Sequence, residues 1–95
     1  MDQAMLRKMQ KMQKEFEANE EIFQQKEFSL EKQGVEVVAK GNKEIVSIKI
    51  KESVLLDPDD PETLEDLITL TINDLFTNID EEHEAIIPNI PGLGF

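Results

Sequence analysis

The chain has 95 residues, with 21 Asp and Glu against 10 Lys and Arg, so its formal net charge is −11. It contains no cysteine, which excludes a disulfide framework, a thiolate zinc site and a thiol nucleophile. No apolar run approaches the roughly 18 residues that span a bilayer, and the polar N-terminus has no signal-peptide core, so we expect a small cytoplasmic domain.

A long helix is predicted from Asp2 to about Lys26. Large apolar side chains recur there at heptad-like spacing and form a Met stripe, made of Met5, Met9, Met12, Phe16 and Phe23. Asn19 interrupts this stripe. Neither Gly nor Pro occurs before Gly34, and the abundant Gln, Lys, Glu and Met favour helix.

Three short strands are predicted next, because the apolar period changes to two. The alternating segments are residues 28–31, 35–38 and 46–51, separated by a Gln33–Gly34 turn and by the polar segment 40–43. Their spacing predicts a three-stranded antiparallel meander with one covered face and one partly open face.

A second long helix is predicted from Pro61 to about Ile86. Asp60 can cap its first turn, and Pro61 suits the first helical position. We expect one apolar face with further apolar residues at its margins; the face consists of Leu64, Ile68, Leu75, Ile79 and Ile86, and the margins of Leu67, Ile72 and Phe76. Pro88 stops the helix.

The predicted order is therefore α-β-β-β-α, an α+β fold with one domain at residues 1–87 and a flexible Pro/Gly-containing tail at residues 88–95. A first helix of this length would extend roughly 37 Å, which is longer than a compact body of this size is wide. Part of the Met stripe must then overhang the sheet, at a cost of roughly 1.5–3 kcal/mol for each large side chain left in water. We expect a second copy of the chain to cover it, giving a homodimer.

The sequence offers no catalytic or metal site. His83 lies among apolar positions of the second helix, where a lone histidine is most often structural, and no triad spacing surrounds it. The acidic segment 57–61 lacks the spacing and the glycine of a calcium loop and is explained by helix capping. We predict no enzyme activity, no cofactor, no bound metal and no small-molecule substrate.

The charges are divided unevenly along the chain. Residues 1–51 carry all ten basic and nine acidic side chains, whereas residues 52–95 carry twelve acidic side chains and no basic one. Such asymmetry indicates a partner surface or a solvated acidic face.

Four of the basic side chains crowd into eight residues: Arg7, Lys8, Lys11 and Lys14. At 100° per residue, Arg7, Lys11 and Lys14 fall within about 60° of one another, opposite the Met stripe, and Lys8 lies on the flank. This pattern fits either an ordinary solvated helix face or an anion-binding strip. Without interleaved aromatic residues, any nucleic-acid contact would be to phosphates and weakly sequence-specific.

Several segments, in order, resemble the YbaB/EbfC family of small bacterial nucleoid-associated proteins. They are the Met/Gln/Lys-rich opening at residues 5–14, the strand pair at 35–41 and 44–50, the segment 55–68 followed by Asn73–Asp74, and the ending at 90–95. The resemblance implies an α/β homodimer whose helices project like tweezers, located on the nucleoid.

The resemblance also implies binding to double-stranded DNA with little sequence preference. By position, the expected DNA-contacting residues are Arg7, Lys8, Lys11 and Lys14. Because the second helix has no basic residue and should repel phosphate, Lys26, Lys32 and Lys40 are further candidates. This binding would alter the conformation or compaction of DNA and, through it, gene expression. The alternative is an acidic dimeric adaptor or chaperone that holds a protein partner on its Met-rich helices and its negative second half.

Overall fold

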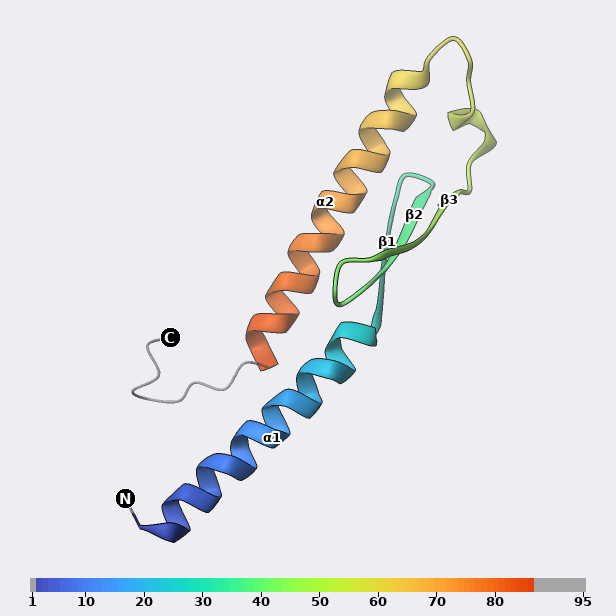
Figure 1. Ribbon diagram of the computed structural model, residues 1–95. Coiled ribbons are helices and arrows are strands. Elements are labelled where there is room, and N and C mark those ends of the chain that lie inside the picture. The colour runs from blue at the N-terminus through green and yellow to red at the C-terminus, as the bar shows by residue number, and fades with distance from the viewer. Residues whose placement is uncertain (1, 87–95) are drawn as a thin grey trace.

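The computed structural model describes residues 2–86. Helix α1 (Gln3–Gln25) is followed by strands β1 (Glu27–Lys32), β2 (Val35–Lys40) and β3 (Ile45–Ile50), a short 3₁₀ turn η1 (Ser53–Leu55) and helix α2 (Pro61–Ile86). The strands form one antiparallel sheet in the order β1-β2-β3 (Figure 1). This confirms the predicted α-β-β-β-α fold; the predicted tail at residues 88–95 lies outside the described residues.

Local hydrogen bonds explain where the elements begin and turn. The Asp2 carboxylate accepts from the Met5 N–H at 2.8 Å and caps α1. At the start of α2, the Thr63 hydroxyl donates to the Asp60 carboxylate at 2.6 Å. Gln33 and Gly34 both have positive φ, at 49° and 94°, which is the conformation of a two-residue hairpin turn.

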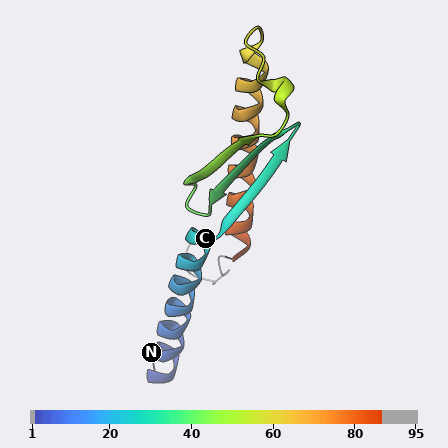
Figure 2. The same cartoon turned by 90° about the vertical axis from the view of Figure 1, so that its right-hand side faces the viewer.

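The core lies between the sheet and α2. One face of the central strand β2 is completely buried through Val35, Val37 and Ala39. Helix α2 packs along β1 and β2, whereas the opposite face of the sheet has no helix over it among the described residues (Figure 2). The predicted arrangement of one covered and one open face is confirmed.

The buried face of α2 differs from the predicted one. Its centre is Leu67, Thr71, Leu75 and Ile79. Leu67 was expected at the margin and Thr71 was not expected at all, while Ile86, placed on the face, is 39% exposed. Steps of four residues drift by about 40° around a helix, so the buried stripe follows the twisted sheet instead of one fixed side.

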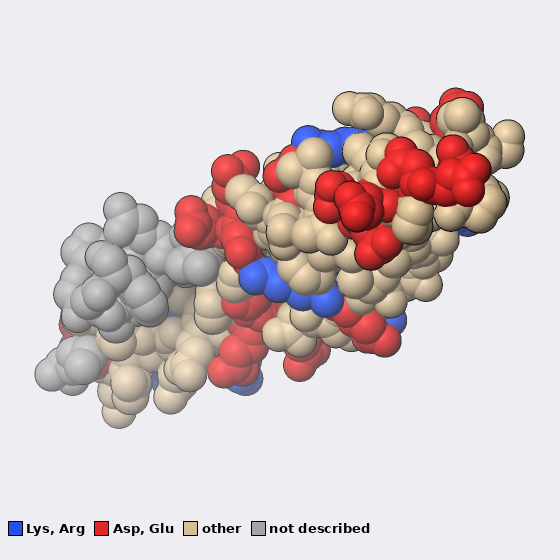
Figure 3. Space-filling model, turned by 90° about the horizontal axis from the view of Figure 1, so that it is seen from above, with Lys and Arg blue, Asp and Glu red and all other residues tan. Residues whose placement is uncertain are grey.

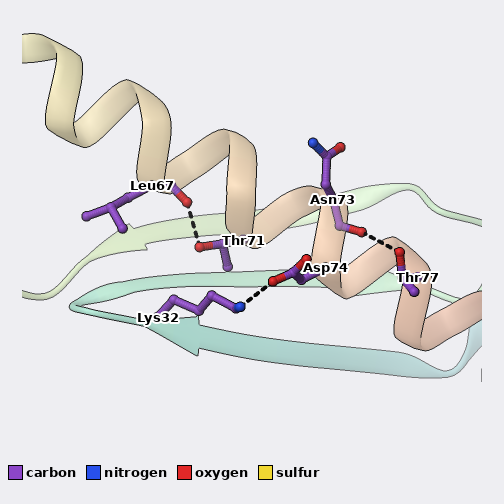
Figure 4. A network of polar contacts seen from close by, with 6 residues as sticks. All are labelled: Lys32, Leu67, Thr71, Asn73, Asp74 and Thr77. Carbon is purple, nitrogen blue, oxygen red and sulfur yellow. Dashed lines mark hydrogen bonds and ion pairs between the residues drawn. The ribbon is translucent and has the colours of Figure 1, made fainter.

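Thr71 is tolerated in the core because its hydroxyl has a partner. It donates a hydrogen bond of 2.6 Å to the Leu67 carbonyl one turn earlier (Figure 4). A buried hydroxyl satisfied in this way carries little of the desolvation cost of an unpaired polar group.

The molecule is strongly elongated. Its extents are 70 × 21 × 14 Å, and its radius of gyration is 19.5 Å, against about 12 Å for a compact domain of this length. Helix α1 causes this shape, because it runs away from the sheet and every residue from 2 to 15 is exposed (Figure 1). The predicted overhang of the first helix is confirmed.

A second apolar surface lies on the edge strand β3. Ile48 is the register partner of the buried Val37, and Ile45 is the partner of Ala39, so both face the side that α2 occupies. Since α2 packs mainly over β1 and β2, it leaves an apolar β3 strip, made of Ile45, Val46 and Ile48, each at least 40% exposed.

Candidate nucleic-acid interface

The basic strip lies on the protruding part of α1 and consists of Arg7, Lys8, Lys11 and Lys14. All four residues are exposed, and they occupy the half of α1 that is remote from the sheet. The fold therefore places the predicted residues together on one rod-shaped surface that a large, extended ligand can reach.

None of these four side chains has an acidic partner in the part of the chain that the structure describes. Within residues 2–86, no carboxylate lies within 4.0 Å of Arg7, Lys8, Lys11 or Lys14. Their charges are therefore available to an anion.

By contrast, four lysines in and next to the sheet form ion pairs with carboxylates. Lys26 lies 3.5 Å from Glu82, Lys43 lies 2.7 Å from Asp80, Lys32 pairs with Asp74 (Figure 4), and Lys51 contacts Glu31 at 2.9 Å and Glu36 at 3.1 Å. Hydrogen bonds to Glu31 and Glu36 raise the pKa of Lys51 above its ordinary value of 10.5. The further candidates Lys26 and Lys32 are thus engaged by α2 carboxylates, while Lys40 has no such partner within residues 2–86.

The body as a whole presents negative charge. Figure 3 shows Asp and Glu side chains gathered toward the end where α2 begins, with few basic side chains between them. Carboxylates therefore gather at the end of the molecule where α2 begins, which lies opposite the start of α1 (Figure 1). Further along α2, Asp74, Asp80 and Glu82 pair with lysines.

The order of charges along α1 is the reverse of what a helix prefers. The helix dipole favours acidic residues in the first turn and basic residues in the last, yet α1 has no acidic residue in its first turn and no basic one in its last. Its basic side chains occupy the N-terminal half, and Glu15, Glu17, Glu20 and Glu21 follow. The interaction of these side chains with the helix dipole does not explain this order.

The other side of α1 carries the Met stripe. Met5, Met9 and Met12 are between 45% and 57% exposed, whereas Phe23 is buried against the sheet. The exposed part of α1 thus has an apolar side and a basic side.

His83 takes part in a contact that the sequence did not predict. Its Nε2 atom lies 2.6 Å and 2.7 Å from the two carboxylate oxygens of Glu20, 63 positions away in the chain. Its ring also packs on Phe23, with 4.9 Å between ring centroids. No local pattern in the sequence links Glu20 to His83, because helix packing alone brings them together.

Residues 2–86 contain no cluster of three or more His, Cys, Asp or Glu side chains arranged to hold a metal ion. Over the same residues, neither helix combines the length and the apolar character needed to cross a membrane.

Comparison with known proteins identifies the group to which the chain is similar. Residues 1–92 match the model of the YbaB/EbfC DNA-binding family. A nucleoid-associated protein of Mycoplasmopsis pulmonis is 44% identical over 87 residues, which cover 92% of this chain and 86% of that protein. A nucleoid-associated protein of Mycoplasma mobile is 45% identical over 92 residues, covering 97% of this chain and 96% of that protein.

A solved structure has a similar fold. The crystal structure of the uncharacterized protein HP0035 from Helicobacter pylori is 26% identical and has a TM-score of 0.71, covering 90% of this chain and 92% of that one. The family is one of nucleoid-associated DNA-binding proteins rather than of enzymes. By its fold and over almost its whole length, the chain belongs to the YbaB/EbfC DNA-binding family.

Proposed function

We propose that the protein binds double-stranded DNA on the bacterial nucleoid, through phosphate contacts made by the basic strip. The carrying observation is that Arg7, Lys8, Lys11 and Lys14 are exposed on the overhanging part of α1 with no carboxylate within 4.0 Å among the described residues. Family membership and the names of the relatives support DNA as the ligand.

The binding should have little sequence preference. Lysine and arginine on a helix of this kind engage phosphates, which are the same for every sequence. Two duplexes of equal length and unrelated sequence should therefore bind with similar affinity. If the basic strips of two subunits bind one duplex, the DNA should bend or compact. The extension of a single tethered DNA molecule, measured at rising protein concentration, tests this effect.

The second part of the proposal is that the protein acts as a homodimer. Two apolar surfaces support it, the exposed Met stripe of α1 and the β3 strip, since a monomer would leave both in water. The edge of β3 also leaves backbone groups available for pairing with another chain. Light scattering at micromolar concentration should give twice the chain mass, and a value near 10.9 kDa would contradict the dimer.

Fluorescence anisotropy with a labelled duplex at several salt concentrations tests DNA binding. Eight phosphate contacts at most, four from each subunit, give a log–log salt slope no steeper than about −7. Lys11→Gln should make the slope shallower by about 1.8, because a dimer loses two contacts. Lys49→Gln is the matched control, since Lys49 is an exposed lysine of β3 with no ion pair among the described residues.

Two results would overturn the DNA proposal. One is the absence of binding at about 50 mM salt, where phosphate contacts are strong. The other is unchanged binding when Arg7, Lys8, Lys11 and Lys14 are all replaced by Glu.

The alternative partner is a basic protein held by an acidic adaptor or chaperone. The absence of any basic residue after Lys51, together with the exposed Val54 and Leu56, favours it as the second candidate. Purification from cells without nuclease separates the two functions. Retained nucleic acid supports the first, and a stoichiometric basic protein supports the second.

A further inference from the structure

Among residues 2–86, helix α1 contacts the rest of the structure only near its C-terminal end. Phe23 is its buried residue, the Gly41 N–H donates to the Lys26 carbonyl at 2.9 Å, and the Asn42 N–H donates to the Gln24 carbonyl at 3.2 Å. We use the name α1 arm for residues 3–15, all of which are exposed. Its direction is therefore set by contacts around residues 20–26.

The Glu20–His83 pair is the one side-chain hydrogen bond between α1 and α2 among residues 2–86. Both carboxylate oxygens of Glu20 lie within 2.7 Å of Nε2 of His83. The side chains are 22% and 34% exposed, so the pair is partly shielded from water. The Phe23 ring packs beside the imidazole and restricts where it can move.

A small change at this pair has a large effect at the basic strip. Arg7 lies 13 residues before Glu20, which is about 20 Å along a helix. A tilt of about 10° at Glu20 therefore displaces Arg7 by about 3.5 Å, enough to take it out of hydrogen-bond distance of a phosphate.

From this geometry we infer that Glu20 and His83 are positioning residues, which hold the α1 arm in the direction that DNA binding requires. The inference rests on the proposed function for its consequence, although the arm's direction is measurable without DNA. Neither residue would touch DNA itself.

Other charged side chains line the same hollow as the Glu20–His83 pair. The other charged groups nearby already have partners: Lys43 from the β2–β3 loop pairs with Asp80 of α2, and Lys26 pairs with Glu82. Glu20 has its partner in His83. The α1 arm should therefore be held less firmly when either member of the pair is replaced by a residue that cannot make this contact.

Spin-label distance measurements test the direction of the α1 arm. The chain has no cysteine, so Gln10→Cys on the arm and Asn78→Cys on α2 give a unique labelled pair. Dilution with a tenfold excess of unlabelled protein removes distances between subunits. We expect a narrow distribution in the parent protein and a broad one in Glu20→Gln and His83→Gln.

The matched control is Glu21→Gln, which removes the same charge from the neighbouring exposed position. It should leave the distance distribution as in the parent protein. The exchanged pair, Glu20→His with His83→Glu, should restore the narrow distribution. That rescue distinguishes positioning from a loss of folding, which circular dichroism detects separately.

DNA affinity provides the second measurement. Loss of a negative charge from α1 should by itself strengthen binding to phosphate, and Glu21→Gln shows the size of that effect. We expect Glu20→Gln to bind about two- to tenfold more weakly than Glu21→Gln. The exchanged pair should recover the affinity.

The outcomes separate the inference from the proposed function. If the parent protein fails to bind DNA, the proposed function fails, and the distances still test the positioning role. If the distances stay unchanged in Glu20→Gln and His83→Gln, the positioning role is wrong. If the distances broaden while Glu20→Gln and Glu21→Gln bind DNA equally, the link between the arm's direction and DNA is wrong.

Discussion

Gly41 lies directly against the backbone of Phe23. A Cβ atom at position 41 would come within 2.0 Å of the Phe23 carbonyl oxygen and 2.8 Å of its ring. The nearest of these atoms belongs to the Phe23 backbone, which cannot move aside as a flexible side chain could. Glycine at this position thus allows the end of α1 to sit on the turn between β2 and β3.

Replacement of this glycine should destabilise the junction. Gly41→Ala forces the turn away from Phe23 and is expected to lower the free energy of unfolding by about 1–3 kcal/mol. Urea denaturation followed by circular dichroism measures the change. Ser29→Ala, at an exposed position of β1, should change stability by less than about 0.5 kcal/mol, and an equal effect of both variants would contradict this account.

Stability and DNA binding should move in opposite directions at Arg7. Arg7→Glu replaces a repulsive neighbour of Lys11 by an attractive one at the favourable i, i+4 spacing, worth about 0.2–0.5 kcal/mol. Amide hydrogen exchange in α1 should therefore slow while the DNA affinity falls. Faster exchange would contradict this prediction, because it would show that Arg7 stabilises the helix.

The core of α2 should respond differently to the loss of volume and to the loss of a hydroxyl. Leu75 is 1% exposed, and Leu75→Ala is expected to cost about 2–5 kcal/mol because it leaves a cavity. Thr71→Val keeps the volume and removes a hydroxyl bonded only to its own helix, so the change should stay within about 1.5 kcal/mol. Thermal unfolding of both variants compares them, and a larger loss in Thr71→Val would contradict the packing described.

Lys51 should contribute to stability over a defined pH range. Glu31 and Glu36 face each other across β1 and β2, and Lys51 bridges them. Because the pKa of Lys51 is raised in the native state, its contribution is complete below 10.5 and is lost as the pH rises through the raised value. The difference in unfolding free energy between the parent and Lys51→Gln should shrink at high pH, while Lys49→Gln should show no such trend.

The order of the helices and strands, and the approximate bounds of the two long helices, could be predicted because local signals determine them. The Pro61–Ile86 helix has a cap at Asp60 and a proline at its first position, and its predicted bounds match the structure. The first helix and the Gln33–Gly34 turn were likewise predicted from residues adjacent in the sequence. The position of the basic strip on one side of α1 follows from helix periodicity alone, although its DNA contacts stay a prediction.

Features that depend on packing between distant elements could not be predicted. Whether Thr71 or Ile86 is buried depends on how the twisted sheet follows α2, and the exposure of Ile48 depends on α2 lying over β1 and β2. The partner of His83 belongs to another helix, 63 positions away. None of these relations leaves a periodic signal in the sequence.

The elongated shape has a consequence for the net charge of −11. The extent of 70 Å is several times the Debye length, which is about 8 Å at 0.15 M salt and about 30 Å at 0.01 M. At physiological ionic strength, a phosphate beside Arg7 is therefore screened from most carboxylates of α2, and at very low salt it is not. Distance and salt screening together make the start of α1 locally cationic in an acidic protein. As the salt concentration falls below about 0.05 M, the affinity for DNA should therefore rise less steeply than counterion release alone requires.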